Sequence, residues 1–328
     1  MAPKLPKMAP KVVDVLIVGG GPAGLTVAST VVRQLHTGIL FDSGVYRNGR
    51  TRHMHNVLGF DHVAPETFRM KSKGDILRRY DTVEFKRAYI ETVKKLDNGN
   101  FQATDGWANV YEGRKVVIAT GVKDILPQIE GFDFCWGRGV FPDLLCHGYE
   151  AWDQGGKSAG LFAFDIFNNT ETVSQVGNTA LQLSKNLRIY TNGDEEFTSE
   201  IETKAWRPDF KSRITIEKRR IRSLRMLSDD TSQVLVTLDD GTQFEESCVA
   251  YQPHIEINGP FAKQLGLEMG AQGEIKISSP FNETSVPGVF AAGDAASQVR
   301  VVPNAINGGY LAGSGLITQL QAEKAQMS

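Results

Sequence analysis

A glycine cluster between an apolar run and an amphipathic stretch sets the first constraint on the fold. Residues 12–18 read VVDVLIV, residues 19–24 read GGGPAG, and a second apolar run, GILFD, occupies residues 38–42. The stretch between the two apolar runs has helical spacing. This order predicts a strand, a tight turn, a helix and a parallel strand, which is the βαβ unit that binds dinucleotides. The chain is therefore expected to be an α/β protein.

The positions of the cluster have separate physical roles. Gly19 permits the tight turn, Gly21 lets the backbone approach a pyrophosphate, and Gly24 lets the helix pack closely on the strand. The N-terminus of the helix favours anionic phosphates. Asp42 ends the second strand and is expected to accept hydrogen bonds from ribose hydroxyls. The predicted dinucleotide-binding residues are Gly19, Gly21, Pro22, Ala23, Gly24 and Asp42.

Composition narrows the function classes. The chain has 328 residues, enough for two domains, and its 36 Lys and Arg balance 38 Asp and Glu. This balance offers no general attraction for nucleic acid or an anionic membrane. No apolar run reaches the length of a membrane span. Three cysteines do not make a disulfide scaffold, so a reducing, cytoplasmic setting is expected.

A second α/β unit follows the first. Strand-like runs at 157–164 and 187–191 flank a helical stretch at 172–186, and turn-punctuated strand-like runs come after them. We therefore expect a first nucleotide-binding domain formed by 11–124 and 253–328. A second domain is expected to be inserted at 125–252, and residues 1–10 are expected to form a flexible tail.

Several further motifs carry a family resemblance. They are VVIATG at 116–121, GRGV at 137–140, GVFAAGD at 288–294 and PNAI at 303–306. In this order, with GGGPAG, they resemble the thioredoxin reductase family over nearly the whole chain. CHGYE at 146–150 and DSGVYRNGRTRHMHN at 42–56 look closer to its fungal branch related to gliotoxin-type dithiol oxidases.

The resemblance implies a two-dinucleotide-binding-domain flavoprotein with FAD in the first domain. It implies that Asp294 contacts the ribityl–phosphate region and that the last helix points its positive end at the flavin, which would stabilise the anionic reduced form. It also implies a homodimer that acts on a small secondary metabolite. The further FAD-binding positions are Ser43, Arg47, Asn48, His53, Gly121, Gly293, Asp294, Asn304 and Ala305.

Two departures from the family pattern concern the inserted domain. Its first strand runs into residues 165–169, DIFNN, where a reductase has its nicotinamide-site glycines. The next strand is followed by Asp194, Glu195 and Glu196, which would repel the 2′-phosphate that an arginine cluster binds in the reductases. We expect a degenerate NAD(P)-type domain that does not bind NADPH well. The flavin would then be reduced by a substrate and reoxidised most simply by O2.

The C-x-x-C pair of the family is incomplete. Asp143 takes the position of the first cysteine and Cys146 that of the second. Dithiol exchange needs two sulfurs, so the ordinary cycle is lost. His147 is the candidate acid/base, with Asp143 as a helper or substrate contact. The alternative role for Asp143 is to cap a helix. Three roles are open for Cys146: a packing residue, a site of transient covalent adducts with flavin or substrate, or a relic.

The lead function is an FAD-dependent oxidase of an alcohol, amine or C–H substrate. A dithiol oxidase that forms a disulfide in a small molecule, a flavin-bound non-redox acid/base catalyst and a non-enzymatic flavoprotein are the alternatives. His53 and His55 have a spacing seen in metal sites, but no second ligand cluster accompanies them in sequence, so no metal site is predicted. The alternatives for this segment are a role in substrate binding and a structural hydrogen-bonding role.

Overall fold

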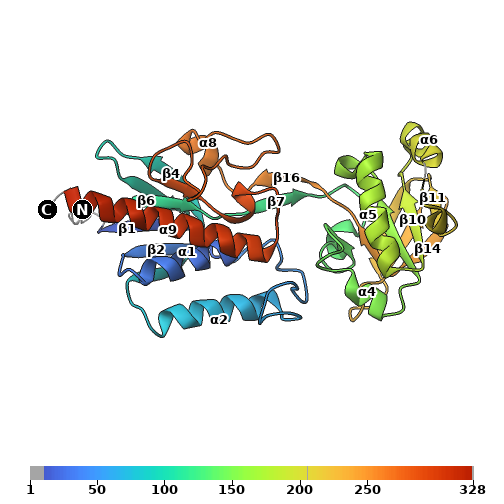
Figure 1. The fold of residues 1–328 in the computed structure, drawn as a ribbon, viewed down its shortest axis with the longest axis horizontal. Coiled ribbons are helices and arrows are strands. Elements are labelled where there is room, and N and C mark those ends of the chain that lie inside the picture. The colour runs from blue at the N-terminus through green and yellow to red at the C-terminus, as the bar shows by residue number, and fades with distance from the viewer. Residues whose placement is uncertain (1–10, 205, 327–328) are drawn as a thin grey trace, which may run out of the picture. The chain divides into compact units, whose positions relative to one another are not determined.

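The structure, a computed structural model, describes residues 11–204 and 206–326. The chain divides into two compact units (Figure 1). Unit 1 comprises residues 1–47, 66–123 and 256–328, and unit 2 comprises 48–65 and 124–255. The proposed domain boundaries at 124/125 and 252/253 differ by one to three residues from these, but segment 48–65 groups with unit 2. The predicted tail at 1–10 lies outside the described residues.

Unit 1 is built on one sheet whose main strand order is β3-β2-β1-β6-β5-β4, with β17 beside β6. Strand β1 pairs in parallel with both β2 and β6. The helices and strands are β1 (Val12–Val18), α1 (Pro22–Val32), β2 (Gly38–Asp42), α2 (Pro65–Leu77), β3 (Val83–Arg87), β4 (Ile90–Lys95), β5 (Phe101–Asp105), β6 (Val110–Ile118), α8 (Phe261–Leu265), β17 (Val289–Ala291), the 3-10 helix η2 (Gly293–Ala296) and α9 (Val302–Gln326). Strands β7 (Val122–Ile125) and β16 (His254–Ile257) each contain residues of both units.

Small residues bring the long helix α9 against α1 (Figure 1). A Cβ added at Gly309 would lie 2.4 Å from the Ala23 carbonyl oxygen, and one at Gly313 would lie 2.9 Å from the Thr30 Cβ. The two helices therefore approach more closely than larger side chains permit. Apolar residues of β1, α1 and α9 form one core on this side of the sheet, and a second apolar cluster contains Leu16 and residues of β4, β5 and α8.

Unit 2 contains a parallel sheet with the order β11-β10-β9-β15-β8 and an antiparallel sheet with the order β12-β13-β14. Its elements are α3 (Phe132–Cys135), β8 (Val140–Phe141), α4 (Tyr149–Asp153), β9 (Ser158–Phe162), the 3-10 helix η1 (Asp165–Phe167), α5 (Thr170–Leu183), β10 (Asn186–Tyr190), α6 (Glu195–Thr203), α7 (Pro208–Lys211), β11 (Ile214–Glu217), β12 (Ile221–Met226), β13 (Val234–Leu238), β14 (Gln243–Glu246) and β15 (Cys248–Ala250). Both units are thus mixed α/β, as predicted.

Candidate functional site

The glycine loop after β1 has the geometry that its sequence predicts. Gly19 has φ +122°, and an added Cβ would lie 2.2 Å from the Ala119 carbonyl oxygen. A Cβ at Gly24 would lie 1.9 Å from the Gly19 carbonyl oxygen. A Cβ at Gly21 would meet no atom within 4 Å, and Gly21 is the N-cap of α1 without a side-chain hydrogen bond. The loop thus presents bare backbone and open space at a helix N-terminus, which fits a pyrophosphate.

Asp42 organises the end of β2. Its carboxylate accepts hydrogen bonds from the Gly44 N–H at 2.9 Å and from the Tyr46 hydroxyl at 2.6 Å. Burial, followed by the bond to Asp42, raises the pKa of Tyr46 to about 12. Ser43 is exposed, and its hydroxyl accepts from the Val45 N–H. The ribose contact predicted for Asp42 stays a prediction.

The second group of predicted FAD residues in unit 1 includes an ion pair. Arg47 Nη1 lies 3.0 Å from Asp294 Oδ2, although 247 residues separate them in sequence. Gly293 begins η2 with φ +74°, and Gly121 has φ +68° with open space where a Cβ would lie. The ion pair joins the segment after β2 to the loop after β17.

The first turn of α9 carries the other two predicted residues of this group. Asn304 donates from Nδ2 to Ser297 Oγ at 2.8 Å and to the Val299 carbonyl at 2.7 Å, while Ala305 is buried. The predicted closing helix is present as α9, and its position against the flavin stays a prediction.

Asn48 and His53 belong to unit 2, unlike the other predicted FAD positions. The Asn48 carbonyl accepts from the Thr51 N–H at 3.2 Å. The His53 ring stacks on His62 with ring centroids 4.0 Å apart. Burial, followed by the neighbouring His62 and His55, lowers the pKa of His53. Within unit 2 these contacts join His53 to a histidine cluster.

Asp143 fixes the backbone of the loop that carries Cys146 and His147. Its Oδ1 accepts from the Cys146 N–H at 2.7 Å, and the Gly148 N–H donates to the Leu144 carbonyl at 2.9 Å. The predicted capping role therefore takes a different form, because Asp143 caps an irregular turn and helix α4 begins only at Tyr149. Residues 143–148 thus form a hydrogen-bonded turn that precedes the helix.

Cys146 is a thiol at neutral pH. Burial, followed by Asp143, raises its pKa to about 11, and Asn56 Nδ2 lies 3.6 Å from its sulfur. Cys135 and Cys248 are buried, and burial raises their pKa values to about 11 and about 12. All three cysteines are free. A thiolate, which thiol exchange requires, is disfavoured at each of them.

His147 is partly buried and stacks on Phe141, with ring centroids 4.8 Å apart and planes 15° apart. Burial is the largest influence on its pKa and lowers it below the ordinary 6.5. Asp143 and Glu150 oppose this shift, and His55 adds to it. The imidazole is therefore neutral at pH 7 and able to accept a proton.

The counterpart loop in unit 2 follows β9. Asp165 has φ +55° and begins η1, and its Oδ2 accepts from the Tyr251 hydroxyl at 2.5 Å. Helix α5 has Asn169 as its N-cap, and Asn169 Oδ1 accepts from the N–H groups of Glu171 and Thr172 at 2.9 and 3.1 Å. Side chains of the protein itself thus hold the turn after β9 and bond two of the first N–H groups of α5.

The end of β10 is also acidic. Asp194 caps α6 by accepting from the Phe197 N–H, and Glu195 and Glu196 occupy the first turn. Asp194 also accepts from Asn168 Nδ2 at 3.2 Å. Negative side chains at this helix N-terminus complement the helix dipole and oppose a bound phosphate.

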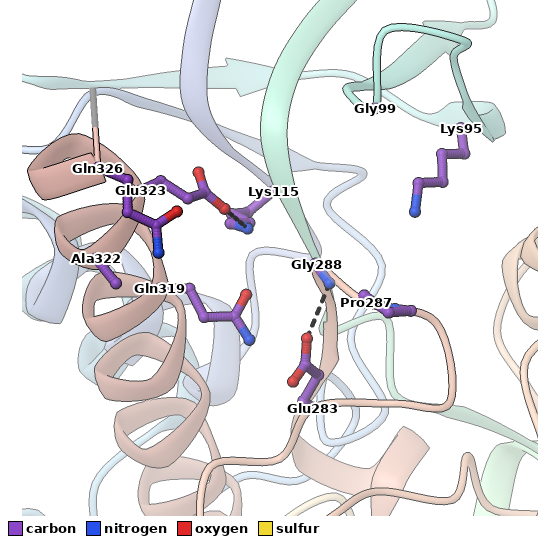
Figure 2. A pocket seen from close by; sticks show the side chains of 10 residues that line it. All are labelled: Lys95, Gly99, Lys115, Glu283, Pro287, Gly288, Gln319, Ala322, Glu323 and Gln326. Atoms are coloured by element: carbon purple, nitrogen blue, oxygen red, sulfur yellow. Dashed lines mark hydrogen bonds and ion pairs between the residues drawn. The ribbon is translucent and has the colours of Figure 1, made fainter.

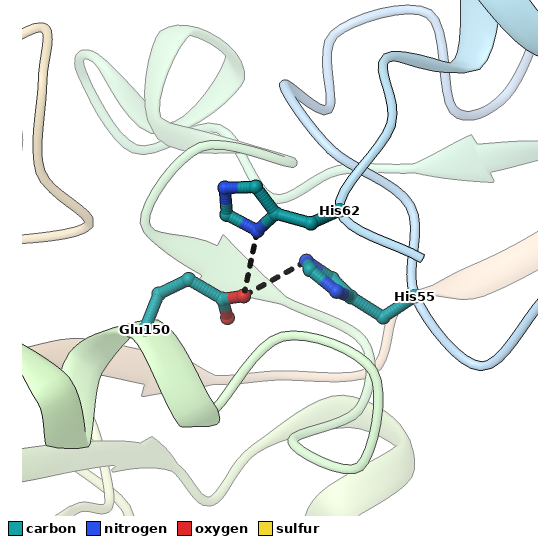
Figure 3. A group of neighbouring side chains, drawn as sticks. All are labelled: His55, His62 and Glu150. Carbon is teal, nitrogen blue, oxygen red and sulfur yellow. Dashed lines mark ion pairs between the residues drawn. The ribbon is translucent and has the colours of Figure 1, made fainter. Parts of the chain in front are cut away.

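Two clusters in unit 2 were not predicted from the sequence. Glu246 is fully buried; it forms an ion pair with Arg188 at 2.5 Å and accepts a hydrogen bond from the Tyr190 hydroxyl at 2.7 Å. These contacts stabilise the fold of unit 2. The second cluster joins His55, His62 and Glu150 (Figure 3). Only the H-x-H spacing around His55 gave a signal, because His62 lies seven residues further along the same loop and Glu150 lies on helix α4.

A pocket of about 490 Å³ lies in unit 1, away from the predicted cofactor residues. Figure 2 shows the Lys115–Glu323 pair beside it and Glu283 accepting from the Gly288 N–H. Glu323 is 19 residues after Asn304 on α9, or about 28 Å along the helix. The lining residues are Lys95, Gly99, Lys115, Glu283, Pro287, Gly288, Gln319, Ala322, Glu323 and Gln326.

The part of the chain that the structure describes contains no helix long and apolar enough to cross a membrane. The cytoplasmic setting expected from the cysteine content stays a prediction.

Known proteins resemble this chain over nearly its full length. The pyridine nucleotide-disulphide oxidoreductase family model matches residues 13–153 and 188–309. Thioredoxin reductase aclD of Aspergillus oryzae is 37% identical over 315 residues, which cover 95% of this chain and 98% of the relative. Thioredoxin reductase tcpT of Claviceps purpurea is 37% identical over 95% of each chain. Thioredoxin reductase sirT of Leptosphaeria maculans is 36% identical over 97% of this chain and 98% of its own.

Solved structures agree on the fold. A putative thioredoxin reductase TrxB from Bacillus anthracis is 21% identical with a TM-score of 0.83, covering 95% of this chain and 99% of its own. An oxidoreductase from Agrobacterium tumefaciens is 26% identical with a TM-score of 0.79 and the same coverage. The chain belongs to the pyridine nucleotide-disulphide oxidoreductase family, as a thioredoxin reductase-like oxidoreductase whose cofactor is FAD.

Proposed function

We propose that this protein is an FAD-dependent oxidase of a small secondary metabolite and that it works without NADPH. The substrate is an alcohol, an amine or an activated C–H compound that loses a hydride and a proton. The observation that carries the proposal is the N-terminus of α5, where Asn169 occupies two of the helix N–H groups. In unit 2 the hydrogen bond between Asp165 and Tyr251 holds a turn at the place that corresponds to the glycine loop of unit 1. In unit 1 the space beside Gly21 is open to a pyrophosphate.

The loop at 143–147 supports a reaction that does not use thiol exchange. Asp143 cannot form a disulfide, and its carboxylate is bonded to the Cys146 N–H. Cys146 stays protonated at neutral pH because its pKa is about 11. In this proposal Cys146 packs in the loop and carries no covalent step.

His147 accepts the proton that the substrate loses. Its imidazole is neutral at pH 7, and its stacking on Phe141 holds the ring in one orientation. Asp143 stabilises the imidazolium that forms, because its charge favours the protonated ring. Bound FAD would supply the hydride acceptor and the electron donor to O2, and O2 with two electrons and two protons gives hydrogen peroxide.

The substrate class and assembly rest on the similarity to the fungal relatives. The relatives are named thioredoxin reductases. The segments CHGYE and RTRHMHN resemble the fungal branch of the family, and from this resemblance we infer that the substrate is a small metabolite. A homodimer in the cytoplasm and the absence of a nucleic-acid or membrane partner belong to the same proposal.

Anaerobic spectroscopy of the holoenzyme tests the proposal. NADPH, dithiothreitol and candidate alcohols and amines are added in turn while the flavin absorbance is recorded, and O2 is then admitted and hydrogen peroxide measured. We expect no rapid bleaching by NADPH, bleaching by one of the metabolites, and peroxide on reoxidation. Rapid NADPH-driven bleaching would overturn the proposal, and so would turnover of a metabolite without use of oxygen, which is the non-redox outcome.

A matched pair of variants separates the oxidase from a dithiol oxidase, the candidate that the thioredoxin reductase relatives favour. Asp143→Cys restores the C-x-x-C pair and is expected to make the flavin reducible by dithiothreitol. Asp143→Ser, which has a similar size and no second thiol for exchange, is expected to leave the flavin as unreactive toward dithiothreitol as it is in the wild type. Equal bleaching of the wild type and Asp143→Cys by dithiothreitol would favour the dithiol oxidase.

A further inference from the structure

Three side chains of unit 2 form a ligand set that the proposed flavin chemistry does not use. We propose that His55, His62 and Glu150 bind a divalent transition-metal ion of the Zn²⁺ class. Figure 3 shows both imidazoles pointing at the Glu150 carboxylate. Their ligand atoms lie within 4.8 Å of one another. Two histidines and a carboxylate are a common set for Zn²⁺ and for other first-row divalent ions.

The chain is folded so that the two histidines meet. Met54 and Val63 form an isolated antiparallel bridge, with the Met54 N–H donating to the Val63 carbonyl at 2.9 Å. His55 follows Met54 and His62 precedes Val63, so the bridge brings the two histidines to the same end of a closed loop. The Asn56 N–H donates to Asp61 Oδ1 at 3.1 Å and ties the loop a second time. The histidine pair is therefore held by backbone contacts.

Glu150 reaches the same point from the second position of α4. Its Oε1 lies 2.8 Å from His55 Nε2 and 3.9 Å from His62 Nδ1. Tetrahedral Zn²⁺ with bonds of 2.0–2.1 Å separates its ligand atoms by about 3.3 Å. The observed distances bracket this value, so binding requires side-chain shifts of the order of 1 Å.

Asp61 supplies the outer contact that metal-bound histidines usually make. His55 faces Glu150 with Nε2 and faces Asp61 Oδ1 with Nδ1 at 3.4 Å. A proton on Nδ1 leaves the Nε2 lone pair free for a metal ion, and the carboxylate fixes this tautomer and increases the basicity of the ring. An ordinary ion pair with Glu150 does not need this second carboxylate.

The backbone of His62 is in the left-handed region, with φ +55°. Histidine is one of the residue types that adopt this conformation more often than most, so the value alone does not indicate strain. The His62 imidazole points toward Glu150 (Figure 3), and its side chain remains 61% exposed. Three protein ligands with an exposed side leave a coordination position open to water or to a small molecule, as in catalytic rather than structural zinc sites.

The test is calorimetric titration of Zn²⁺ into the EDTA-treated and desalted holoenzyme at pH 7.5, with metal content measured after dialysis. We expect one equivalent of Zn²⁺ per chain. Glu150→Gln and His62→Asn are expected to weaken binding at least 100-fold, and asparagine tolerates the left-handed backbone at position 62. His254→Asn changes an exposed histidine on β16 and is the matched control; its affinity should equal that of the wild type.

Two results would overturn this inference. One is the lack of saturable Zn²⁺ binding by the wild type. The other is equal affinity in the wild type, Glu150→Gln and His62→Asn, with unchanged thermal unfolding showing that both variants are folded. Neither result depends on substrate turnover, so the metal site and the proposed oxidase function fail independently.

Discussion

Helices α1 and α5 each follow a parallel strand, yet their N-termini differ in what occupies the first N–H groups. The N-cap of α1 is Gly21, which has no side chain and faces open space. The N-cap of α5 is Asn169, which accepts two of those N–H bonds itself. The same local topology thus offers a phosphate site in unit 1 and a self-capped helix in unit 2. The two helices differ in whether their first backbone N–H groups are free to bind a phosphate or are already bonded to a side chain.

If unit 2 does not bind a nucleotide, its loop at 143–147 supplies the acid/base chemistry. His147→Gln is expected to lower kcat about 10²–10⁴-fold, because a positioned base contributes that much to proton transfer. The flavin spectrum and FAD content should not change. The matched control is His254→Gln, which alters an exposed histidine on β16. Undiminished turnover in His147→Gln would remove this residue from the mechanism.

Two alanine substitutions in the unit 1 loop separate folding from cofactor binding. Gly24→Ala places a Cβ 1.9 Å from the Gly19 carbonyl and is expected to destabilise the protein by about 3 kcal/mol. Gly21→Ala meets no protein atom within 4 Å, so the apoprotein should unfold at the wild-type temperature while FAD affinity falls at least tenfold. Thermal unfolding of the apoproteins and FAD titration check both. Wild-type FAD affinity in Gly21→Ala would contradict the assigned pyrophosphate approach.

The pH profile adds a smaller effect. Burial lowers the pKa of His147 below 6.5, so the ring stays neutral near pH 7 and becomes protonated as the pH falls through the lowered pKa. We expect kcat/KM to be flat above pH 6.5 and to fall about tenfold per pH unit well below the pKa. Asp143, His55 and Glu150 are the charged or titratable neighbours that influence this pKa. The profile is measured with EDTA present, and an acid limb that begins above pH 6.5 would contradict the assignment.

The sequence predicts the unit 1 loop well because its determinants are local. Gly19, Gly21 and Gly24 act within one strand–turn–helix, so their spacing alone carries the geometry. The lack of glycine after β9 could also be recognised from the sequence, because it too is a local feature. The actual contacts there, from Asn169 to its own helix and from Tyr251 to Asp165, depend on folding and were not predicted.

The histidine cluster is the opposite case. His62 and Glu150 join His55 only through the Met54–Val63 bridge and helix α4, and no spacing along the chain encodes that meeting. The placement of segment 48–65 with unit 2 has the same origin. From the sequence, segment 48–65 was predicted to belong to the first domain, whereas its contacts group it with residues 124–255.

Removal of the unit 2 cap has the smallest expected effect. Asn169→Ala takes away the acceptor for two N–H groups of α5 and is expected to cost about 1 kcal/mol of unfolding free energy. NADPH binding should not appear, because Asp165 and the acidic start of α6 remain. Chemical denaturation measures the first expectation. A variant that gains NADPH affinity would show that the cap alone excludes the nucleotide.

Calorimetric titration of NADPH into the FAD-loaded wild-type protein tests the difference between the two units most directly. The difference in their helix N-termini predicts no saturable heat of binding up to about 1 mM NADPH, which corresponds to a binding free energy weaker than about −4 kcal/mol. Saturable binding with a micromolar Kd would contradict it, because unit 2 would then accept a dinucleotide despite Asn169, Asp165 and Tyr251.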